Sequence, residues 1–426
     1  MRGIVPTFQL PYDHETLTLH VPDGYPTTLI APQEIAPAPD PVQAVDRALD
    51  TTIGDVTLSA CADARSAAIA INDKTRPVPH EYLLPPLLAR LEALGLGPDA
   101  VTLIIATGAH APMPPEEFAR VVPPAILARY RVISHDCDAE ADLVYLGETG
   151  RGTPAWINRA FAEADLRIVV GNIEPHQFEG FSGGVKSAVI GLGGRATINA
   201  NHAMLTHPKS ALARYADNPA RQDLEDLGRM ADVHVALNAV LTSHKEIVRV
   251  LFGDPVVVME VGIPLVRQIY EVPVDQPCDL VVVAPGGAPK DINLYQAQKA
   301  LAHASRVTRA GGAIILVAAC PEGIGSRGYE RWMLEGDVQS CDDVFARFQR
   351  EGFRVGPHKA VLIARDASRL QGVWLVSELA PDLVRQLLLR PAVLDAALTE
   401  ALAGLPDDAH VGLMPLGNAT VPCLLD

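Results

Sequence analysis

Short apolar runs rich in β-branched residues alternate with longer stretches of helical periodicity along this chain of 426 residues. The runs are AAIAIN (67–72), VTLIIA (101–106), RIVVGN (167–172), DLVVVA (279–284) and AIILVA (313–318). Helical patterns lie between them, for example at 81–94 and 294–307. This alternation is typical of parallel α/β sheets. We therefore expect an α/β fold of two lobes, each built on a mostly parallel sheet with flanking helices.

The length of the chain favours two domains. A stretch rich in turn residues, 268–277, precedes a new strand and predicts the boundary. We expect an N-terminal domain over 1–271 and a C-terminal α/β domain over 272–408, with 409–426 rejoining the first. Ligands of open α/β sheets lie beyond the carboxyl ends of the strands, so we expect the active site in the cleft between the lobes.

The composition is acidic, with 35 lysines and arginines against 51 aspartates and glutamates and a net charge of −16. Such a charge argues against nucleic acid or an anionic membrane as a partner. No apolar run approaches the roughly 18–20 residues that span a bilayer. The amino terminus has no basic start followed by an apolar core, so we expect a cytoplasmic protein. Six scattered cysteines offer no zinc signature.

Polar residues follow four of the apolar runs at the point where each ends. Asp73 follows the first run, and the second and third are followed closely by His110 and His176. The fourth leads through a Pro-Gly-Gly turn to a helical stretch bearing Gln296 and Lys299. Because the carboxyl ends of parallel strands meet at one edge of a sheet, these positions indicate a site more readily than packing.

The segment from Glu174 to His202 sets Lys186 among glycines directly after a predicted buried strand. It comes close to a phosphate-binding P-loop, since Gly180 stands six positions before the lysine. Val185 occupies the place of the glycine that lets the backbone wrap a phosphate, which counts against that motif. A nucleotide-binding protein with a degenerate P-loop stays an alternative, as does a solvated lysine.

Histidines and cations near the strand ends suggest particular chemistry. His110 and His176 on one sheet edge could flank a substrate and move a proton on either face. His202 could be a metal ligand, but one histidine needs further ligands from a cofactor. Arg76 in a rigid turn could hold a carboxylate with its planar guanidinium.

Four motifs in this order resemble those of the nickel-pincer-nucleotide-dependent lactate racemase family. The motifs are DKTRP (73–77), ATGAH (106–110), EPHQFEGFSGGVKS…NH (174–202) and GGAPKDINLYQAQK (286–299). The resemblance covers nearly the whole chain. It implies an isomerase that racemises or epimerises a small 2-hydroxy acid, with a first domain that carries the cofactor and a second that contributes substrate-binding residues.

The resemblance also implies a cofactor and residues that hold it. The cofactor would be the nickel-pincer nucleotide, pyridinium-3-thioamide-5-thiocarboxylic acid mononucleotide, tethered covalently to Lys186. His202 would be the nickel ligand from the protein, and Asp73 and Thr75 would contact the cofactor. The enzymes that make the cofactor would be the partners that load it.

The same resemblance assigns the substrate-handling residues. His110 and His176 would be the two acid/base residues, one for each enantiomer. Substrate-binding residues would be Arg76, Tyr295, Gln296 and Lys299. Hydride transfer coupled to proton transfer suits a 2-hydroxy acid, because direct deprotonation next to a carboxylate would create a dianion.

Three positions depart from the lactate-active pattern, which leaves the substrate open. Ala111 and Val185 stand where arginines are common, and His358 stands where the family has a tryptophan near the substrate. A larger 2-hydroxy acid, or a sugar acid epimerised at C2, fits these changes equally well. An NAD-dependent 2-hydroxy acid dehydrogenase is a further alternative, since it shares hydride chemistry and a parallel sheet.

Overall fold

The computed structural model describes residues 7–336, 338–354 and 356–425, and the chain forms two compact units. The central unit comprises Glu34–Ile269, and the terminal unit joins the residues up to Gln33 with those from Tyr270 onward. Within these described residues, no helix combines the length and the apolar character needed to cross a bilayer.

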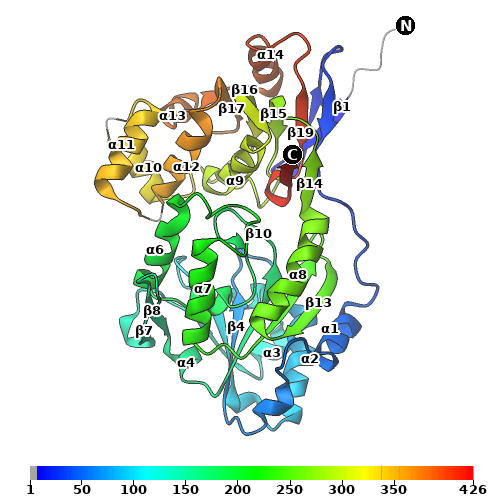
Figure 1. Ribbon diagram of the computed structural model, residues 1–426, viewed down its shortest axis with the longest axis vertical. Coiled ribbons are helices and arrows are strands. Elements are labelled where there is room, and N and C mark those ends of the chain that lie inside the picture. The colour runs from blue at the N-terminus through cyan, green and yellow to red at the C-terminus, as the bar shows by residue number, and fades with distance from the viewer. Residues whose placement is uncertain (1–6, 337, 355, 426) are drawn as a thin grey trace. The chain divides into compact units, whose positions relative to one another are not determined.

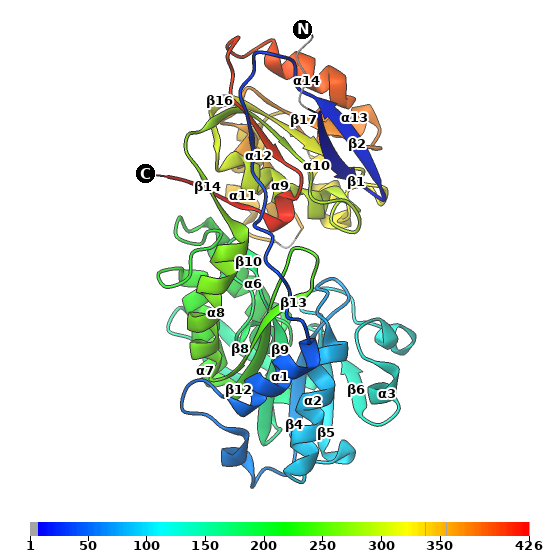
Figure 2. The same ribbon diagram turned by 90° about the vertical axis from the view of Figure 1, so that its right-hand side faces the viewer.

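A mixed sheet with strand order β13-β12-β9-β4-β5-β6 forms the middle of the central unit (Figure 2). Its strands are β4 (Ala67–Asn72), β5 (Val101–Ala106), β6 (Arg131–Ser134), β9 (Leu166–Ile173), β12 (Val235–Leu241) and β13 (Ile247–Gly253). All neighbours run parallel except β12 and β13. The chain leaves β4 toward β5 and returns to β9 on its other side, so the strand order reverses between β4 and β9. Ligands bind at the carboxyl ends of strands at such a switch point.

Helices cover both faces of this sheet (Figures 1 and 2). The helices are α1 (Pro41–Asp50), α2 (His80–Ala93), α3 (Pro124–Leu127), α4 (Arg159–Ala162), α5 (Lys186–Val189), α6 (Arg195–Ala203), α7 (Pro219–Met230) and α8 (Pro255–Tyr270). Two short hairpins accompany them, β7 (Leu143–Glu148) with β8 (Pro154–Asn158) and β10 (Pro175–His176) with β11 (Gly180–Phe181). The α1 and α2 helices lie on one face, and α5, α7 and α8 belong to the other side.

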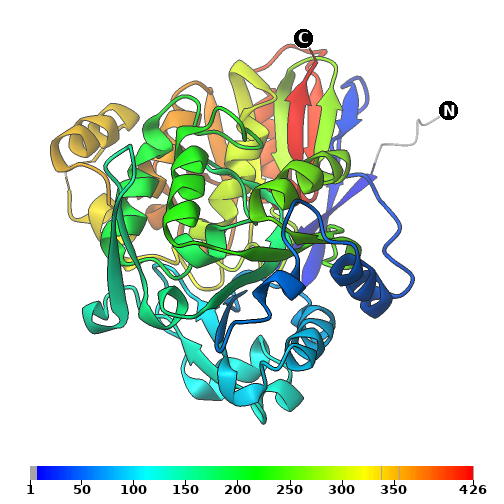
Figure 3. The ribbon, with the colours of Figure 1, turned by 60° about the horizontal axis from the view of Figure 1, so that its bottom comes forward.

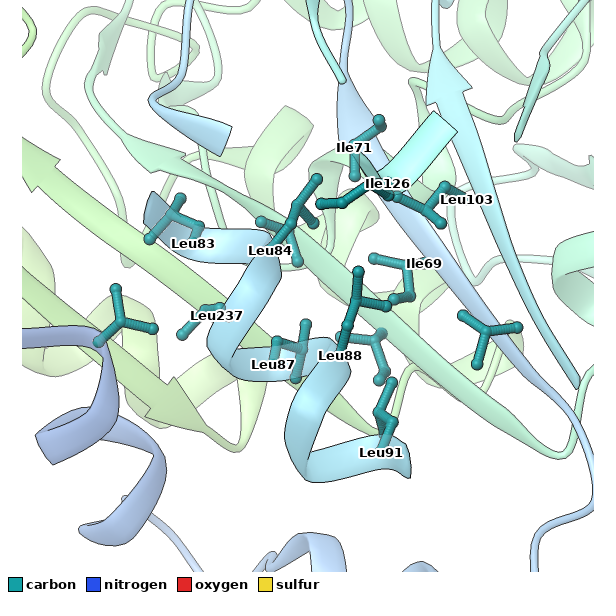
Figure 4. Packing of buried hydrophobic residues seen from close by; sticks show 14 of the residues in the cluster. Ile69, Ile71, Leu83, Leu84, Leu87, Leu88, Leu91, Leu103, Ile126 and Leu237 are labelled. Carbon is teal, nitrogen blue, oxygen red and sulfur yellow. The ribbon is translucent and has the colours of Figure 1, made fainter. Parts of the chain in front are cut away.

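The leucines of α2 show why this helix docks on the sheet (Figure 4). Leu84, Leu88 and Leu91 recur at helical spacing and are buried against apolar residues of the sheet such as Ile69 and Leu103. Fully burying one such side chain contributes roughly 1.5–3 kcal/mol. The alternation of Ala and Ile in β4 puts its isoleucines on this face, so the sequence pattern fixes which side α2 covers.

The terminal unit holds a parallel sheet with strand order β18-β17-β16-β15-β19-β3. Its strands are β3 (Thr27–Leu29), β15 (Cys278–Val283), β16 (Thr308–Val317), β17 (Gly372–Val376), β18 (Arg390–Pro391) and β19 (Val411–Met414). Two pairs lie beside it, β1 (Thr7–Tyr12) with β2 (Glu15–His20) and β14 (Glu271–Val274) with β20 (Val421–Leu424). The helices are α9 (Leu294–Ser305), α10 (Arg327–Leu334), α11 (Cys341–Glu351), α12 (His358–Ala367), α13 (Pro381–Gln386) and α14 (Leu394–Leu402).

This architecture confirms the expected α/β class with two largely parallel sheets. One expectation needs correction: the segment after 408 was expected to rejoin the domain 1–271, but it belongs to the terminal unit and not to the central unit. Its strand β19 pairs with β15 and β3, and β20 pairs with β14, all in the terminal unit. Figure 3 shows this red segment among the yellow-green strands of the same unit.

Residues 7–33 also belong to the terminal unit, although they were expected in the N-terminal domain. Leu10, Leu19 and Val21 are buried in a core that includes Leu280 and Trp374. These apolar side chains cover a face of the terminal sheet that would otherwise meet water. The chain passes between the units first after Gln33 and again at the end of α8, near the expected boundary at 271/272.

Candidate functional site

The carboxyl ends of β4, β9 and β12 carry a row of small and amide side chains. Asn72 is the last residue of β4, and Gly171 of β9 stands opposite Asn238 of β12. Gly171 leaves room for its neighbours, since a Cβ there would lie 3.1 Å from Oδ1 of Asn72. Oδ1 of Asn72 accepts a hydrogen bond of 3.0 Å from Ser187. The row therefore supports the segment that follows β11.

The loop before Lys186 is held from two sides. The amide of Gly184 donates to Oδ1 of Asn238 at 2.7 Å. Arg221 of α7 is buried and donates through Nη1 to the carbonyls of Phe181 and Gly183, at 3.1 and 3.2 Å. A Cβ at Gly184, where φ is +57°, would lie 2.8 Å from Arg221 and from Met259. Only glycine fits this approach, and it fixes the start of α5 at Lys186.

A fully buried carboxylate, Glu179, is the centre of this site. Nζ of Lys186 forms an ion pair with its Oε2, which also lies 3.2 Å from Nδ1 of His176. Nδ1 of His202 lies 3.7 Å from Oε1. Among the described residues, neither oxygen of Glu179 accepts a hydrogen bond of good geometry. The carboxylate of Glu179 thus brings together Lys186, His176 and His202, which the sequence analysis had identified as candidate site residues.

The ring of Phe178 lies between the rings of His176 and His202. The ring of Phe178 meets those of His176 and His202 edge-on, with centroids 4.9 and 5.0 Å apart. Burial lowers the pKa of His202 to about 4, and Glu179 opposes that shift only in part. The imidazole of His202 is therefore neutral at pH 7, which is the form that binds a metal.

Burial also acts on Lys186, lowering the pKa of its ammonium below the ordinary value against the opposing pull of Glu179. Arg76 adds to the lowering, so the guanidinium lies within electrostatic reach of the lysine. A buried lysine with a depressed pKa is a better nucleophile than an exposed one.

His110 forms a second cluster with the turn after β4. Its Nδ1 lies 2.9 Å from Oδ2 of Asp73, while Oδ1 of Asp73 accepts from the amide and hydroxyl of Thr75 at 3.0 and 2.7 Å. Burial alone would raise the pKa of Asp73, but the bonds from His110 and Thr75 outweigh it and hold that pKa below its ordinary value. The ionised carboxylate makes Nδ1 the donor and leaves Nε2 as a base.

Glu174 and Arg76 link the two clusters. Burial would raise the pKa of Glu174, but the ammonium of Lys245 at 2.7 Å and the nearby Arg76 lower it to about 2. Arg76 also donates to the carbonyl of Thr75 at 3.2 Å. The carboxyl ends of β4 and β9 thus bring the predicted residues of the central unit into one charged neighbourhood.

The predicted residues of the terminal unit gather at the start of α9. Asn293 caps the helix by accepting from the amide of Gln296 at 3.1 Å, and Nζ of Lys299 donates to Oε1 of Gln296 at 2.8 Å. The ring of Tyr295 meets that of His358 edge-on, with centroids 6.1 Å apart. Nζ of the buried Lys359 lies 4.9 Å from the centre of the Tyr295 ring.

The sequence interpretation missed Glu179, Asn238 and Arg221. Glu179 stands three residues after His176 in the motif, and this spacing was the available signal. Asn238 lies within a buried apolar strand, where an amide needs a partner. Arg221 lies on a helix with no motif of its own, so only the fold brings it to the loop.

The described residues offer no cluster of protein ligands at His202 that could hold a metal unaided. Groups of three such ligand atoms within 4.8 Å of one another occur among them only at Asp136, Cys137 and Asp138. Any metal at His202 would therefore need ligands from a bound group.

Models of two protein domains match this chain. Residues 12–213 match the lactate racemase N-terminal domain, and residues 274–421 match the lactate racemase C-terminal domain. A lactate racemase of Lactiplantibacillus plantarum is 31% identical over 422 residues, covering 97% of this chain and 98% of the relative. A lactate racemase of Thermoanaerobacterium thermosaccharolyticum is 28% identical, covering 88% and 89%.

Solved structures show the same likeness. The lactate racemase apoprotein from Thermoanaerobacterium thermosaccharolyticum superposes with a TM-score of 0.91 at 27% identity, covering 98% of this chain and all of that one. A protein from Thermotoga maritima superposes with a TM-score of 0.67 at 18% identity, covering 90% and 97%, and shares the fold alone.

Proposed function

The chain belongs to the lactate racemase family and is an isomerase, and on that premise we propose that it inverts C2 of a small 2-hydroxy acid. The observation that carries the proposal is the buried cluster of Glu179 with Lys186, His176 and His202. This cluster places the amine of Lys186, the neutral imidazole of His202 and the imidazole of His176 around the carboxylate of Glu179.

We propose the nickel-pincer nucleotide as the cofactor, because the donor set fits it. Lys186 would hold it covalently, and His202 would bind its nickel. Attachment of the cofactor would acylate the nitrogen of Lys186 and make it neutral. Glu179, whose oxygens accept no well-formed hydrogen bond from the described residues, would then pair with the cationic pyridinium of the cofactor. When bound, the group would supply a reversible acceptor for the hydride of C2.

The two histidines would handle the hydroxyl proton. Nε2 of His110 is the acceptor that its bond to Asp73 leaves available, and it would take the proton as the hydride leaves C2. The substrate would then be a 2-keto acid. Return of the hydride to the opposite face, with a proton from His176, would give the other enantiomer. Each histidine would therefore act as base for one enantiomer and acid for the other.

Cations and amides would hold the substrate carboxylate. We assign Arg76 of the central unit to this carboxylate, and we assign Gln296 and Lys299 on α9 of the terminal unit to substrate binding. The Lys299–Gln296 hydrogen bond aligns both side chains in advance, which lowers the entropy lost on binding. Tyr295 would line the same site. Asp73 and Thr75, expected from sequence to contact the cofactor, we assign instead to orienting His110.

The test begins with the protein produced beside the enzymes that make the cofactor. We expect a covalent gain of mass on Lys186 and bound nickel, and interconversion of enantiomers without an external hydride acceptor. His110→Ala and His176→Ala should each lose most turnover while keeping the mass gain. An unchanged mass would contradict the cofactor assignment, and retained racemisation in both variants would contradict the two-base assignment.

A panel of chiral 2-hydroxy acids, including lactate and C2-epimeric sugar acids, would identify the substrate. Net oxidation dependent on NAD would instead favour a dehydrogenase. The ion pair of Lys186 with Glu179 speaks against a phosphate-binding role for this lysine, and stabilisation by ATP would contradict our assignment.

A further inference from the structure

The residue before the proposed nickel ligand, Asn201, lies in a chain of buried hydrogen bonds. Its Nδ2 donates to the carbonyl of Ala220 at 2.9 Å and to Oδ2 of Asp223 at 3.0 Å. Both partners are acceptors only, because a carbonyl has no proton and Asp223 accepts through both oxygens. The amide of Asn201 is therefore oriented one way, with Oδ1 turned from Asp223.

The far end of the chain sets the direction of these bonds. Oγ1 of Thr149 accepts from the amide of Thr153 at 3.2 Å and donates its proton to Oδ1 of Asp223 at 2.6 Å. Asn201 and Asp223 are fully buried, and Thr149 and Thr153 are nearly so. A directed network of this kind holds each member in one orientation, since a reversed amide would leave buried groups unpaired.

The oriented amide faces the imidazole of His202. Oδ1 of Asn201 lies 3.4 Å from Nδ1 of His202, and Oε1 of Glu179 lies 3.7 Å from the same nitrogen. Both oxygens can only accept a proton from that nitrogen. The proton of the neutral imidazole is then on Nδ1, and the lone pair is on Nε2.

We propose that Asn201 is a positioning residue that fixes the Nδ1–H tautomer of His202, leaving Nε2 as the nitrogen that binds the metal. The part that concerns nickel rests on the proposed function, whereas the tautomer belongs to the protein alone. Hydrogen bonds to the second nitrogen of a metal-binding histidine fix its orientation and raise its basicity.

The fully buried His135 provides an internal contrast. Nε2 of His135 lies 3.0 Å from the carbonyl of Gly193, which makes Nε2 the donor. Its Nδ1 lies 3.2 Å from Nδ2 of Asn158, whose Oδ1 is turned to the amide of Phe161. These two Asn–His pairs of the described residues thus have opposite polarity.

The first test is a long-range ¹H–¹⁵N spectrum of the apoprotein with ¹⁵N-labelled histidine at neutral pH. Signals would be assigned by their loss in His202→Gln and His135→Gln. We expect the proton on Nδ1 of His202 and on Nε2 of His135. A proton on Nε2 of His202 would overturn the proposal, and this spectrum needs neither cofactor nor a variant of Asn201.

The second test compares Asn201→Leu with Asn158→Leu as the matched control. In the loaded protein we expect a chelator to remove nickel about 10-fold faster from Asn201→Leu than from the wild type, per Lys186 adduct. Asn158→Leu should release nickel at the wild-type rate even though it loses a buried hydrogen bond.

The outcomes separate the two proposals. Equal nickel release from the wild type and Asn201→Leu would overturn the positioning role, as would the same acceleration in both variants. If the wild type produced beside the cofactor-making enzymes carried no Lys186 adduct, the proposed function would be contradicted. The tautomer of His202 measured in the apoprotein would still stand. Should Asn201→Leu fail to fold, the wild-type spectrum still decides the tautomer.

Discussion

At the scale of single residues, the site depends on two buried carboxylates, of which the sequence motifs identified Asp73 and missed Glu179. Glu179 is buried and holds Lys186 and two histidines, and Asp73 holds His110. A buried charge is tolerated only when it is paired, so each carboxylate is tied to the cation or imidazole that it faces.

Glu179 and Lys186 should show coupled effects on the stability of the apoprotein. Each single change, Glu179→Gln or Lys186→Met, leaves the other charge buried without its partner and should cost about 3–5 kcal/mol. The double variant should cost less than the sum of the two. Denaturant unfolding of the four proteins measures this coupling.

An exposed pair gives the control for that cycle. Asp382 and Arg385 lie about one helical turn apart, with Nη1 of Arg385 2.7 Å from Oδ1 of Asp382, and both side chains are largely exposed. Removing either should change the free energy of unfolding by less than about 1 kcal/mol. Strict additivity in the Glu179–Lys186 cycle would contradict the ion pair.

Asp73→Asn should impair catalysis without impairing cofactor attachment. The amide would present a donor or a weaker acceptor to Nδ1 of His110, and the tautomer with Nε2 as base would no longer be favoured. We expect turnover to fall by about 100-fold or more. The Lys186 adduct, measured by mass, should be unchanged.

Lys74→Met is the neighbouring control, because among the described residues the ion pair of Lys74 is with the partly exposed Glu117. Its turnover should stay within about twofold of the wild type. An Asp73→Asn enzyme with wild-type turnover would remove Asp73 from the proposed mechanism.

At the scale of elements, apolar periodicity predicts strands and helices well where the segment is buried. The strands β4 and β5 begin and end at the predicted residues. The strand β16 begins at Thr308, five residues before its predicted start. The sequence did not predict these first residues as a strand because they include the exposed Ala310 and Gly311, which are typical of a turn. Pairing with a neighbour makes such a segment a strand, and its own sequence does not show that.

The hairpin β10–β11 is likewise absent from the sequence interpretation. Its strands are two residues each, and its loop carries Glu179 inward. The glycine-rich stretch that follows was predicted to be a loop around Lys186, and its shape depends on Arg221 and Asn238 from other elements.

Gly184→Ala should therefore destabilise the protein more than a glycine change on an open surface. A Cβ at Gly184 would meet Arg221 and Met259 at 2.8 Å, whereas one at Gly95 would meet nothing within 4 Å. Both glycines have positive φ, at +57° and +90°, so the comparison isolates the steric cost.

We expect Gly95→Ala to cost about 1 kcal/mol and Gly184→Ala about 2–4 kcal/mol. Thermal or denaturant unfolding of both variants measures the difference. Equal losses would mean that the loop before Lys186 can move aside.

At the scale of the whole molecule, both ends of the chain complete one unit. The terminal sheet takes β3 from the amino-terminal segment and β19 from the carboxyl-terminal segment, and both lie on the same side of β15. A boundary drawn along the sequence therefore cuts a sheet that the fold assembles from distant segments.

Fragments of the chain should reveal this organisation. Residues 34–269 keep their own sheet and core and should unfold cooperatively when produced alone. Residues 272–408 lack β3 and β19, which would expose the edge of β15 and its apolar face, so this fragment should aggregate or melt without a transition. Circular dichroism during heating distinguishes them, and cooperative melting of 272–408 would contradict the strand order.

The sequence by itself determined the α/β class, the main buried strands and the residues at their carboxyl ends, because periodicity and motifs are local properties. It also predicted Lys186, His176 and His202 as one segment. Only the tertiary structure decided which carboxylate faces each of them and which unit the chain ends join. Ion pairs, hydrogen bonds and strand neighbours connect residues far apart in the chain, and the packing of the whole core selects those partners.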